Sequence, residues 1–376
     1  MSGFDALDLG TLATRRSHKW RKYPSDVLPA FIAEMDYDLA EPLAEALRAA
    51  VSRQDCGYAD ATGLGEAFAA FAADRHGWTV DPGRVHMVPD VGAGIDTTVR
   101  LVTGPGDGVV INPPVYPPFY EFIQACGRTV VEVPLVGTQL DFAGLEAAFA
   151  AGARAYLLCN PHNPTGRVFS ADDLQLIADL ADRYRVTVIA DEIHAPLTLA
   201  GARHTPFMSF PEGAAVGVTL ASASKAFNIA GLKCAVAVAG SAEIDRMLAS
   251  APDSLRWGAG LFGVLATEAA WRSGGAWLDE LLLHLDRMRM LFGTLLAQRL
   301  PAARYVPPQA GYLAWVDCSD LGLGAEPADA MLARGRVALA RGLDFGAVGD
   351  GFVRVTIGTS SALLTEIVDR MAKAAG

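Results

Sequence analysis

The sequence predicts an α/β protein whose larger part is a mostly parallel β-sheet and whose smaller, C-terminal part is α+β. Short runs that are apolar at consecutive positions recur along the chain, which is typical of strands buried on both faces. Amphipathic helical patterns lie between several of these runs, as they do where helices connect parallel strands. The length of 376 residues suits two domains that share a core.

Six apolar runs are predicted to form buried strands, and two intervening segments to form helices. The runs are VVIN at 109–112, TVVEV at 129–133, AYLLCN at 155–160, VTVIAD at 186–191, VGVTLAS at 216–222 and CAVAVAG at 234–240. One helix is predicted over 41–55, where Pro42 occupies the first turn. Another is predicted over 170–185, where Ser170 and Asp173 have the spacing of a helix cap.

A long apolar stripe predicts the start of the second domain. From Trp277 to Leu296, apolar side chains recur at the spacing of one helix face. Two later runs, LAWVDC at 313–318 and FVRVTIG at 352–358, are predicted strands. We therefore expect three parts. They are an N-terminal segment over 1–40 that packs with the small domain, a large domain over 41–284, and a small domain over 285–376.

Composition and charge exclude several functional classes. Charged residues make up 19% of the chain, and no run of about 18 uninterrupted apolar residues could span a bilayer. The net charge of −11 disfavours nucleic acid or an anionic membrane as a partner. The five cysteines are scattered without a C-x-x-C pair, so we expect neither a disulfide framework nor a metal site. Because the N-terminus carries no basic apolar leader, we expect a cytoplasmic protein.

Polar residues follow the predicted strands at the points where the strands end. Asn160 leads into the loop PHNPTG, Asp191 ends a strand in DEIH, and Ser222 ends one in SASK. Tyr116 follows the first strand in NPPVY. In open α/β sheets, ligands collect at the carboxyl ends of the strands. We therefore expect an amide, a carboxylate, a hydroxyl with an amine, and a phenol to meet at one rim of the sheet.

Lys225 is the strongest candidate for a catalytic residue. It lies just beyond a predicted buried strand and is flanked by Ser222, Ser224 and Asn228, which is an unusual position for a solvated surface lysine. A desolvated amine readily forms a Schiff base with an aldehyde. The alternative interpretation is that Lys225 is an ordinary loop lysine. The assignment of a catalytic role therefore depends on its neighbours.

The neighbours of Lys225 fit the ring of pyridoxal 5′-phosphate (PLP). Asp191 is placed to accept the pyridinium N–H, which keeps the ring able to take up electrons. The alternative is a carboxylate that only caps the following segment. Asn163 and His194 are polar groups that can hydrogen-bond the ring hydroxyl, although each alone is more typical of a loop or core residue than of a ligand.

The phosphate of such a cofactor needs hydroxyls, a cation and backbone N–H groups. Ser222 and Ser224 offer hydroxyls, Lys233 offers a cation, and the turn DVGAG at 90–94 offers N–H groups. This glycine turn alone is a weak signal, because it lacks the full G-x-G-x-x-G pattern. Rival sites lack their minimal parts: the seven histidines form no H-E-x-x-H pair, and no G-x-S-x-G elbow occurs.

Eight motifs together carry a family resemblance. They are HKW at 18–20, AEMDY at 33–37, GY at 57–58, PVYPPF at 114–119, CNPHNPTG at 159–166, DEIH at 191–194, SASKAFNIAGLK at 222–233 and FVRV at 352–355. The chain thus resembles fold-type I PLP enzymes of the aspartate aminotransferase superfamily, and within it the cystathionine β-lyases of MalY/PatB type. The resemblance runs from about His18 to Gly358. It implies a PLP-binding large domain with a seven-stranded type of sheet, and a homodimer with a shared active site.

The resemblance also implies a role for each matching residue. Lys225 would carry the cofactor as a Schiff base, Asp191 would pair with the ring nitrogen, and Tyr116 would stack on the ring as the third catalytic residue. The remaining cofactor contacts would come from Asn163, His194, Val91, Gly92, Ser222, Ser224 and Lys233, and from Tyr58 of the other subunit. Arg354 would bind the substrate α-carboxylate through a two-pronged hydrogen bond. The alternative is a surface arginine of the small domain.

The activity that the resemblance implies is carbon–sulfur β-lysis of an S-substituted L-cysteine such as cystathionine, which yields a thiol, pyruvate and ammonia. Three segments depart from the family pattern. AEMDY at 33–37 replaces A-D-M-D-F, DVGA at 90–93 replaces G-V-V-P, and VTIG at 355–358 replaces an L-N-x-A type. These departures concern the substrate more than the cofactor. The alternatives are an aminotransferase, a PLP enzyme that decarboxylates or deaminates a bulky cysteine S-conjugate, and a non-catalytic regulator that binds a partner protein.

Overall fold

The structure, a computed structural model, describes residues 3–253 and 257–376. Its largest element is a seven-stranded sheet with the order β2-β8-β7-β6-β5-β3-β4. The strands are β2 (Val85–Val88), β3 (Gly108–Ile111), β4 (Thr129–Glu132), β5 (Ala155–Cys159), β6 (Thr187–Asp191), β7 (Gly217–Ala221) and β8 (Ala235–Ala239). Neighbouring strands from β4 to β7 are parallel, whereas β8 runs antiparallel to both β7 and β2. The prediction of a mostly parallel sheet is confirmed.

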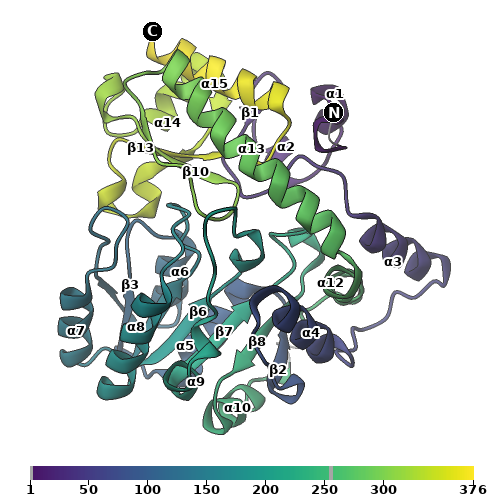
Figure 1. Ribbon diagram of the computed structural model, residues 1–376, viewed down its shortest axis with the longest axis vertical. Helices are drawn as coiled ribbons and strands as arrows, with labels where there is room; N and C mark the ends of the chain where they lie inside the picture. The colour runs from purple at the N-terminus through teal and green to yellow at the C-terminus, as the bar shows by residue number, and fades with distance from the viewer. Residues whose placement is uncertain (1–2, 254–256) are drawn as a thin grey trace.

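Helices cover both faces of this sheet (Figure 1). The fourteen α-helices assigned within the described residues are α1 (Leu9–Ala13), α2 (His18–Arg21), α3 (Glu41–Ser52), α4 (Leu64–His76), α5 (Val91–Val102), α6 (Pro118–Ala125), α7 (Phe142–Ala150), α8 (Ala171–Tyr184), α9 (Pro211–Val216), α10 (Ala242–Ala249), α12 (Leu261–Ser273), α13 (Gly275–Arg299), α14 (Pro327–Ala330) and α15 (Ser361–Ala375). Among the described residues, no helix combines the length and apolar character that a bilayer span requires.

The two-sided covering explains why the strands are apolar at consecutive positions. Along β3, Val110 belongs to one buried cluster, whereas Val109 and Ile111 belong to the other. Successive side chains of a strand point to opposite faces, so both faces need apolar residues when both are covered. Six strands were predicted from such runs and all six are present. The prediction that all six are buried is wrong for β4, which lies at the edge of the sheet and has no buried residue. The seventh strand, β2, was not predicted because the polar His86 interrupts its apolar run and its first two residues are half-buried.

The predicted helices begin close to where their sequence signals place them. The helix predicted from Ser170 is α8, and Ser170 and Asp173 form a reciprocal capping box at its start. The helix predicted over 41–55 is α3, which ends earlier, at Ser52. The long stripe from Trp277 lies within α13.

A second, four-stranded sheet with the order β12-β13-β10-β9 lies in the C-terminal part. Its antiparallel strands are β9 (Arg304–Tyr305), β10 (Leu313–Asp317), β12 (Ala340–Arg341) and β13 (Phe352–Thr356). In Figure 1 the long helix α13 runs from beside α12 to the C-terminal helix α15 and so connects the two parts. Helix α13 continues without a break through residue 284, so it marks no boundary there. The domain limits at 41 and 284 both stay a prediction.

The N-terminal segment packs against the C-terminal part of the chain. Its strand β1 (Leu28–Pro29) pairs in parallel with β11 (Val337–Ala338). Further along, the Asp36 N–H donates to the Gly358 carbonyl at 2.9 Å. A buried ion pair joins Lys19 Nζ to Asp36 Oδ2 at 2.8 Å, with side chains 1% and 4% exposed. Lys19 Nζ also donates to the Glu34 carbonyl at 2.9 Å, so this one ammonium holds two points of the segment.

Replacement of Lys19 by Met should lower the free energy of unfolding by about 3–5 kcal/mol, because Asp36 would remain buried without its cation. Chemical unfolding followed by circular dichroism measures this change. The exposed pair Arg48–Glu41, whose side chains are each 64% exposed, provides the control. Glu41→Gln should cost less than about 1 kcal/mol. Equal effects of the two substitutions would contradict a special role for the buried pair.

Candidate active site

A cavity of about 350 Å³ lies at the carboxyl ends of β5, β6 and β7, beside the start of α5. This volume falls within the range of small-molecule sites. Its described lining residues are Ala33, Asp90, Val91, Gly92, Ala93, Tyr116, Phe122, Cys159, Asn163, Asp191, Ile193, His194, Ser224, Lys225, Ala230, Lys233 and Cys234. The structure therefore brings together most of the residues that the sequence singled out, from loops that are far apart along the chain.

Three of the predicted site residues do not line this cavity. The Ser222 hydroxyl lies behind it, where it donates to the Cys234 carbonyl at 2.7 Å and accepts the Ser224 N–H at 3.1 Å. Tyr58 is 83% exposed, and its ring packs edge-on against Trp257 with centroids 5.2 Å apart. Arg354 is buried beside the cavity and is described below. In a single chain, Tyr58 therefore makes no contribution to this cavity.

Lys225 points its amine towards the N-terminal segment. Its Nζ donates to the Ala33 carbonyl at 3.2 Å, and the Tyr312 hydroxyl donates to the same oxygen at 3.1 Å. Burial, followed by the charge of Arg354, lowers the pKa of Lys225 to about 8. About a tenth of the amine is thus neutral at pH 7, far more than for an ordinary lysine, and a neutral amine can attack a carbonyl carbon or accept a proton.

Asp191 is a buried carboxylate that has few partners. Its side chain accepts the Ile193 N–H at 3.1 Å, and the residue is 4% exposed. Burial raises the pKa of Asp191 to about 7, although the Ile193 N–H and the charge of Lys225 act to lower it. A ligand that brought a cationic N–H to this carboxylate would favour its ionised form.

His194 and Tyr116, which also line the cavity, are neutral. Burial, together with the charges of Lys225 and Arg354, lowers the pKa of His194 to about 3, so its ring is uncharged. Burial, followed by the charge of Asp191, raises the pKa of Tyr116 to about 12, so its phenol keeps its proton. These two rings can pack against a planar ligand or hydrogen-bond it without adding charge.

Arg354 is a buried cation for which no carboxylate partner is found among the described residues. The Arg354 side chain is 6% exposed. Its Nη1 donates to Asn163 Oδ1 at 3.1 Å, and its Nη2 donates to the Phe31 carbonyl at 3.0 Å. Its Nε is buried without a hydrogen-bond partner, and the Phe345 ring lies 5.0 Å from Cζ. Burial lowers its pKa to about 10. The alternative of a surface arginine is wrong, because residues 30–37 and Phe345 cover this face of β13.

The far end of the cavity has the features of an anion site. Helix α5 begins here, so the backbone N–H groups of its first turn lie at this end, and Asp90 Oδ1 accepts one of them, the Ala93 N–H, at 2.8 Å. A side chain in place of Gly92 would put its Cβ 2.7 Å from Phe122 Cζ, so only glycine leaves room at this turn. Lys233 Nζ lies 2.6 Å from Asp90 Oδ2. Asp90 was not predicted as a site residue, although its place in DVGAG directly before the helix marks it as a capping residue.

Sequence reasoning also missed the groups that fix the inner wall of the cavity. Asn228 accepts the Met35 N–H and donates to the Met35 carbonyl, both at 2.8 Å. These two bonds hold Ala33 where its carbonyl receives Lys225 and Tyr312. Ala33 begins the motif AEMDY, but no local pattern gives a role to its carbonyl or to Tyr312, because that role depends on contacts between segments nearly 200 or more residues apart.

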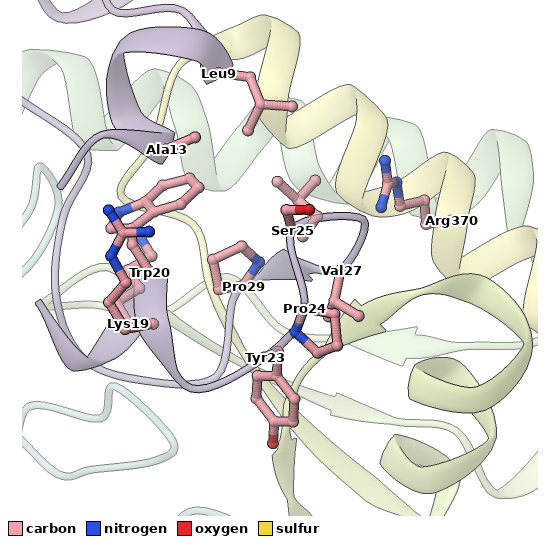
Figure 2. A pocket seen from close by; sticks show the side chains of 12 residues that line it. Leu9, Ala13, Lys19, Trp20, Tyr23, Pro24, Ser25, Val27, Pro29 and Arg370 are labelled. Atoms are coloured by element: carbon pink, nitrogen blue, oxygen red, sulfur yellow. The ribbon is translucent and has the colours of Figure 1, made fainter. Parts of the chain in front are cut away.

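A further cavity, of about 180 Å³, lies between the N-terminal segment and α15 (Figure 2). The three cations that line it already have partners. Lys19 pairs with Asp36, Arg21 donates to the Thr14 carbonyl at 3.1 Å, and Arg370 pairs with Glu366 at 2.7 Å. In the cavity of about 350 Å³, by contrast, Lys225 and Asp191 lack a charged partner in contact within the described part of the chain. That cavity is therefore the better candidate for the active site.

Comparison with known proteins gives a consistent result. The family described as aminotransferase class I and II matches residues 25–371. A Mycobacterium leprae protein with the provisional name cystathionine beta-lyase is 44% identical to this chain. The match covers 98% of this chain and 97% of the M. leprae protein. Cystathionine beta-lyase PatB of Bacillus subtilis is 36% identical, covering 95% and 96%. Cystalysin from Treponema denticola, whose crystal structure contains PLP, aligns with a TM-score of 0.89 and 28% identity over 95% of each chain.

Asp191→Asn should stabilise the cofactor-free chain at pH 8. The pKa of Asp191 in the folded chain, about 7, lies above its unfolded value, so ionisation opposes folding. The free energy of unfolding of the variant should exceed that of the wild type by a difference that grows by up to about 1.4 kcal/mol per pH unit from pH 5 to pH 7. Above pH 7 this difference should level off. Unfolding midpoints across this range measure the trend. Asp182→Asn, on the exposed side of α8, controls for the loss of one carboxylate, and a pH-independent difference for Asp191→Asn would contradict the prediction.

Proposed function

The chain belongs to the aminotransferase class I and II family, whose fold-type I members use PLP, and from this premise we propose that it is a carbon–sulfur β-lyase acting on an S-substituted L-cysteine. The products would be a thiol, pyruvate and ammonia. The observation that carries the proposal is the buried, unpaired Arg354 beside a cavity that also contains Lys225 and Asp191. A substrate α-carboxylate is the missing partner of this arginine.

The residues present fit PLP. The cavity is large enough for it, Asp191 lacks a cationic partner among the described residues, and the start of α5 and Lys233 lie together at one end of the cavity. When bound, PLP withdraws electrons from the substrate Cα and so permits loss of its proton and of the group on Cβ. We propose that Lys225 binds the aldehyde covalently and that Asp191 accepts the ring N–H. The other contacts would come from Tyr116, Asn163, His194, Val91, Gly92, Ser224 and Lys233, while Ser222 supports Ser224 from behind.

The chain's own residues would orient the substrate and move its proton. Arg354 would bind the α-carboxylate through Nε and an Nη group, while its bond to Asn163 fixes the plane of the guanidinium. This orientation would direct the Cα–H bond towards Lys225 Nζ, which, once the substrate amine has replaced it on the aldehyde carbon, would take up the proton as general base. The lowered pKa of Lys225, about 8, suits a base that works near neutral pH. Burial of these groups excludes water from the reacting atoms.

We also propose a cytoplasmic homodimer in which Tyr58 completes the phosphate site of the partner. Tyr58 and Trp257 form an aromatic pair that is 83% and 60% exposed, and Val51 nearby in sequence is 60% exposed. Large apolar side chains gathered on a surface are typical of an interface between subunits.

The assay that separates lysis from transamination uses L-cystathionine, an S-alkyl cysteine, and alanine with 2-oxoglutarate. We expect a free thiol and pyruvate in equal amounts from the first two substrates, and little glutamate from the third. Lys225→Ala should abolish both the products and the visible absorbance of the bound cofactor. Glutamate without thiol would establish an aminotransferase instead, and release of carbon dioxide would establish a decarboxylating enzyme.

Arg354→Lys should lower kcat/KM for cystathionine about 100-fold, because one ammonium cannot reproduce the two-pronged hydrogen bond of a guanidinium. The absorbance of the bound cofactor should be unchanged, since Arg354 lies at the substrate side. Arg341→Lys is the matched control, because Arg341 lies on the adjoining strand β12 and is half-exposed. A change of kcat/KM below threefold for Arg354→Lys would remove this arginine from substrate binding.

A further inference from the structure

We propose that Asp90 occupies, as an internal anion, part of the site where the cofactor phosphate binds, and that it thereby limits the affinity of the protein for PLP. This inference rests on the proposed function, since it concerns the same cavity. It assigns to Asp90 the role of a positioning residue that holds Lys233 and α5 in place while the phosphate is absent.

The geometry places the Asp90 carboxylate on two groups that a phosphate would use. Its Oδ2 lies 2.6 Å from Lys233 Nζ, and its Oδ1 accepts the Ala93 N–H at 2.8 Å as the N-cap of α5. Although partial burial acts to raise the pKa of Asp90, bonds from Lys233 and from the N–H groups of Ala93 and Gly92 outweigh it, and the pKa is lowered. Asp90 is therefore a carboxylate at neutral pH, bound at the anion-binding end of the helix.

The pairing of Asp90 with Lys233 sets the net charge at the end of the cavity where the phosphate would bind. Of the described residues that line the cavity, Lys225 and Lys233 are the cations, and Lys225 lies at the aldehyde end of the proposed cofactor position. The phosphate end thus holds one positive charge, from Lys233, and one negative charge, from Asp90. A phosphate monoester carries between one and two negative charges at neutral pH. Its attraction to Lys233 is offset by repulsion from Asp90, so uncharged donors, namely the Ser224 hydroxyl and backbone N–H groups, must supply most of the binding.

The Asp90–Lys233 pair also has little value as a stabilising contact. The two side chains are 39% and 54% exposed, and exposed ion pairs contribute little to folding. Capping of α5 does not need the negative charge either, because asparagine caps helices as well as aspartate does. The charge of Asp90 can therefore be removed while the cap is kept, which makes the proposal testable with one isosteric change.

The test compares the affinities of the full-length chain, freed of cofactor, for PLP and for pyridoxal, which lacks the phosphate. Asp90→Asn should lower the Kd for PLP at least about tenfold, because repulsion between like charges is lost. The Kd for pyridoxal should be unchanged. Inorganic phosphate should slow PLP uptake by Asp90→Asn at lower concentrations than it does in the wild type. Absorbance of the bound cofactor reports each titration.

Asp96→Asn is the matched control, because it removes one carboxylate from the same helix at a position where Asp96 pairs with Arg100. Its PLP affinity should equal that of the wild type. Unfolding midpoints of the cofactor-free variants verify that α5 is intact, and Asp90→Ser provides a second capping residue without charge. An unchanged or weaker PLP affinity in Asp90→Asn, or equal changes for PLP and pyridoxal, would overturn the proposal. The proposed function fails separately, if the wild type takes up no PLP at Lys225.

Discussion

Burial of charge at the rim of the large sheet is the constraint on which the active site depends. Lys225, Asp191 and Arg354 lie within one poorly solvated region, and none of the three has a charged partner in contact among the described residues. Burial moves the pKa of each towards its neutral form. Such an arrangement costs folding free energy, and a ligand that carries the complementary groups recovers it. An aldehyde, a ring N–H and a carboxylate are those groups.

The segment from Ala30 to Tyr37 connects the charged groups to one another. Arg354 binds the Phe31 carbonyl, Lys225 binds the Ala33 carbonyl, and Asn228 binds both backbone groups of Met35. The backbone of one short segment therefore sets the distance between the substrate side and the cofactor side of the cavity. The segment AEMDY at 33–37, which departs from the usual family pattern, is thus part of the wall that makes these contacts.

The cations at the two ends of the cavity differ in exposure and in ion pairing. At the substrate end, Arg354 is 6% exposed and has no acidic partner within the described residues. At the phosphate end, Lys233 is 54% exposed and already pairs with Asp90. A buried, unpaired cation gains far more from an incoming anion than an exposed, paired one does. The Arg354 end of the cavity consequently favours an incoming anion more strongly than the Lys233 end does.

The sequence by itself determined the mostly parallel sheet, the family, and a set of polar residues most of which line one cavity. Those inferences depend on local order: consecutive apolar residues identify strands buried on both faces, and polar residues such as Asp191 directly follow the strands. Only the tertiary structure decided that Arg354 is buried, that Asp90 engages Lys233, and that Ala33 receives Lys225. These facts depend on contacts between segments more than a hundred residues apart, as 143 separate Asp90 from Lys233. A local pattern records which residues neighbour one another along the chain, whereas burial and charge pairing depend on which distant segments cover them.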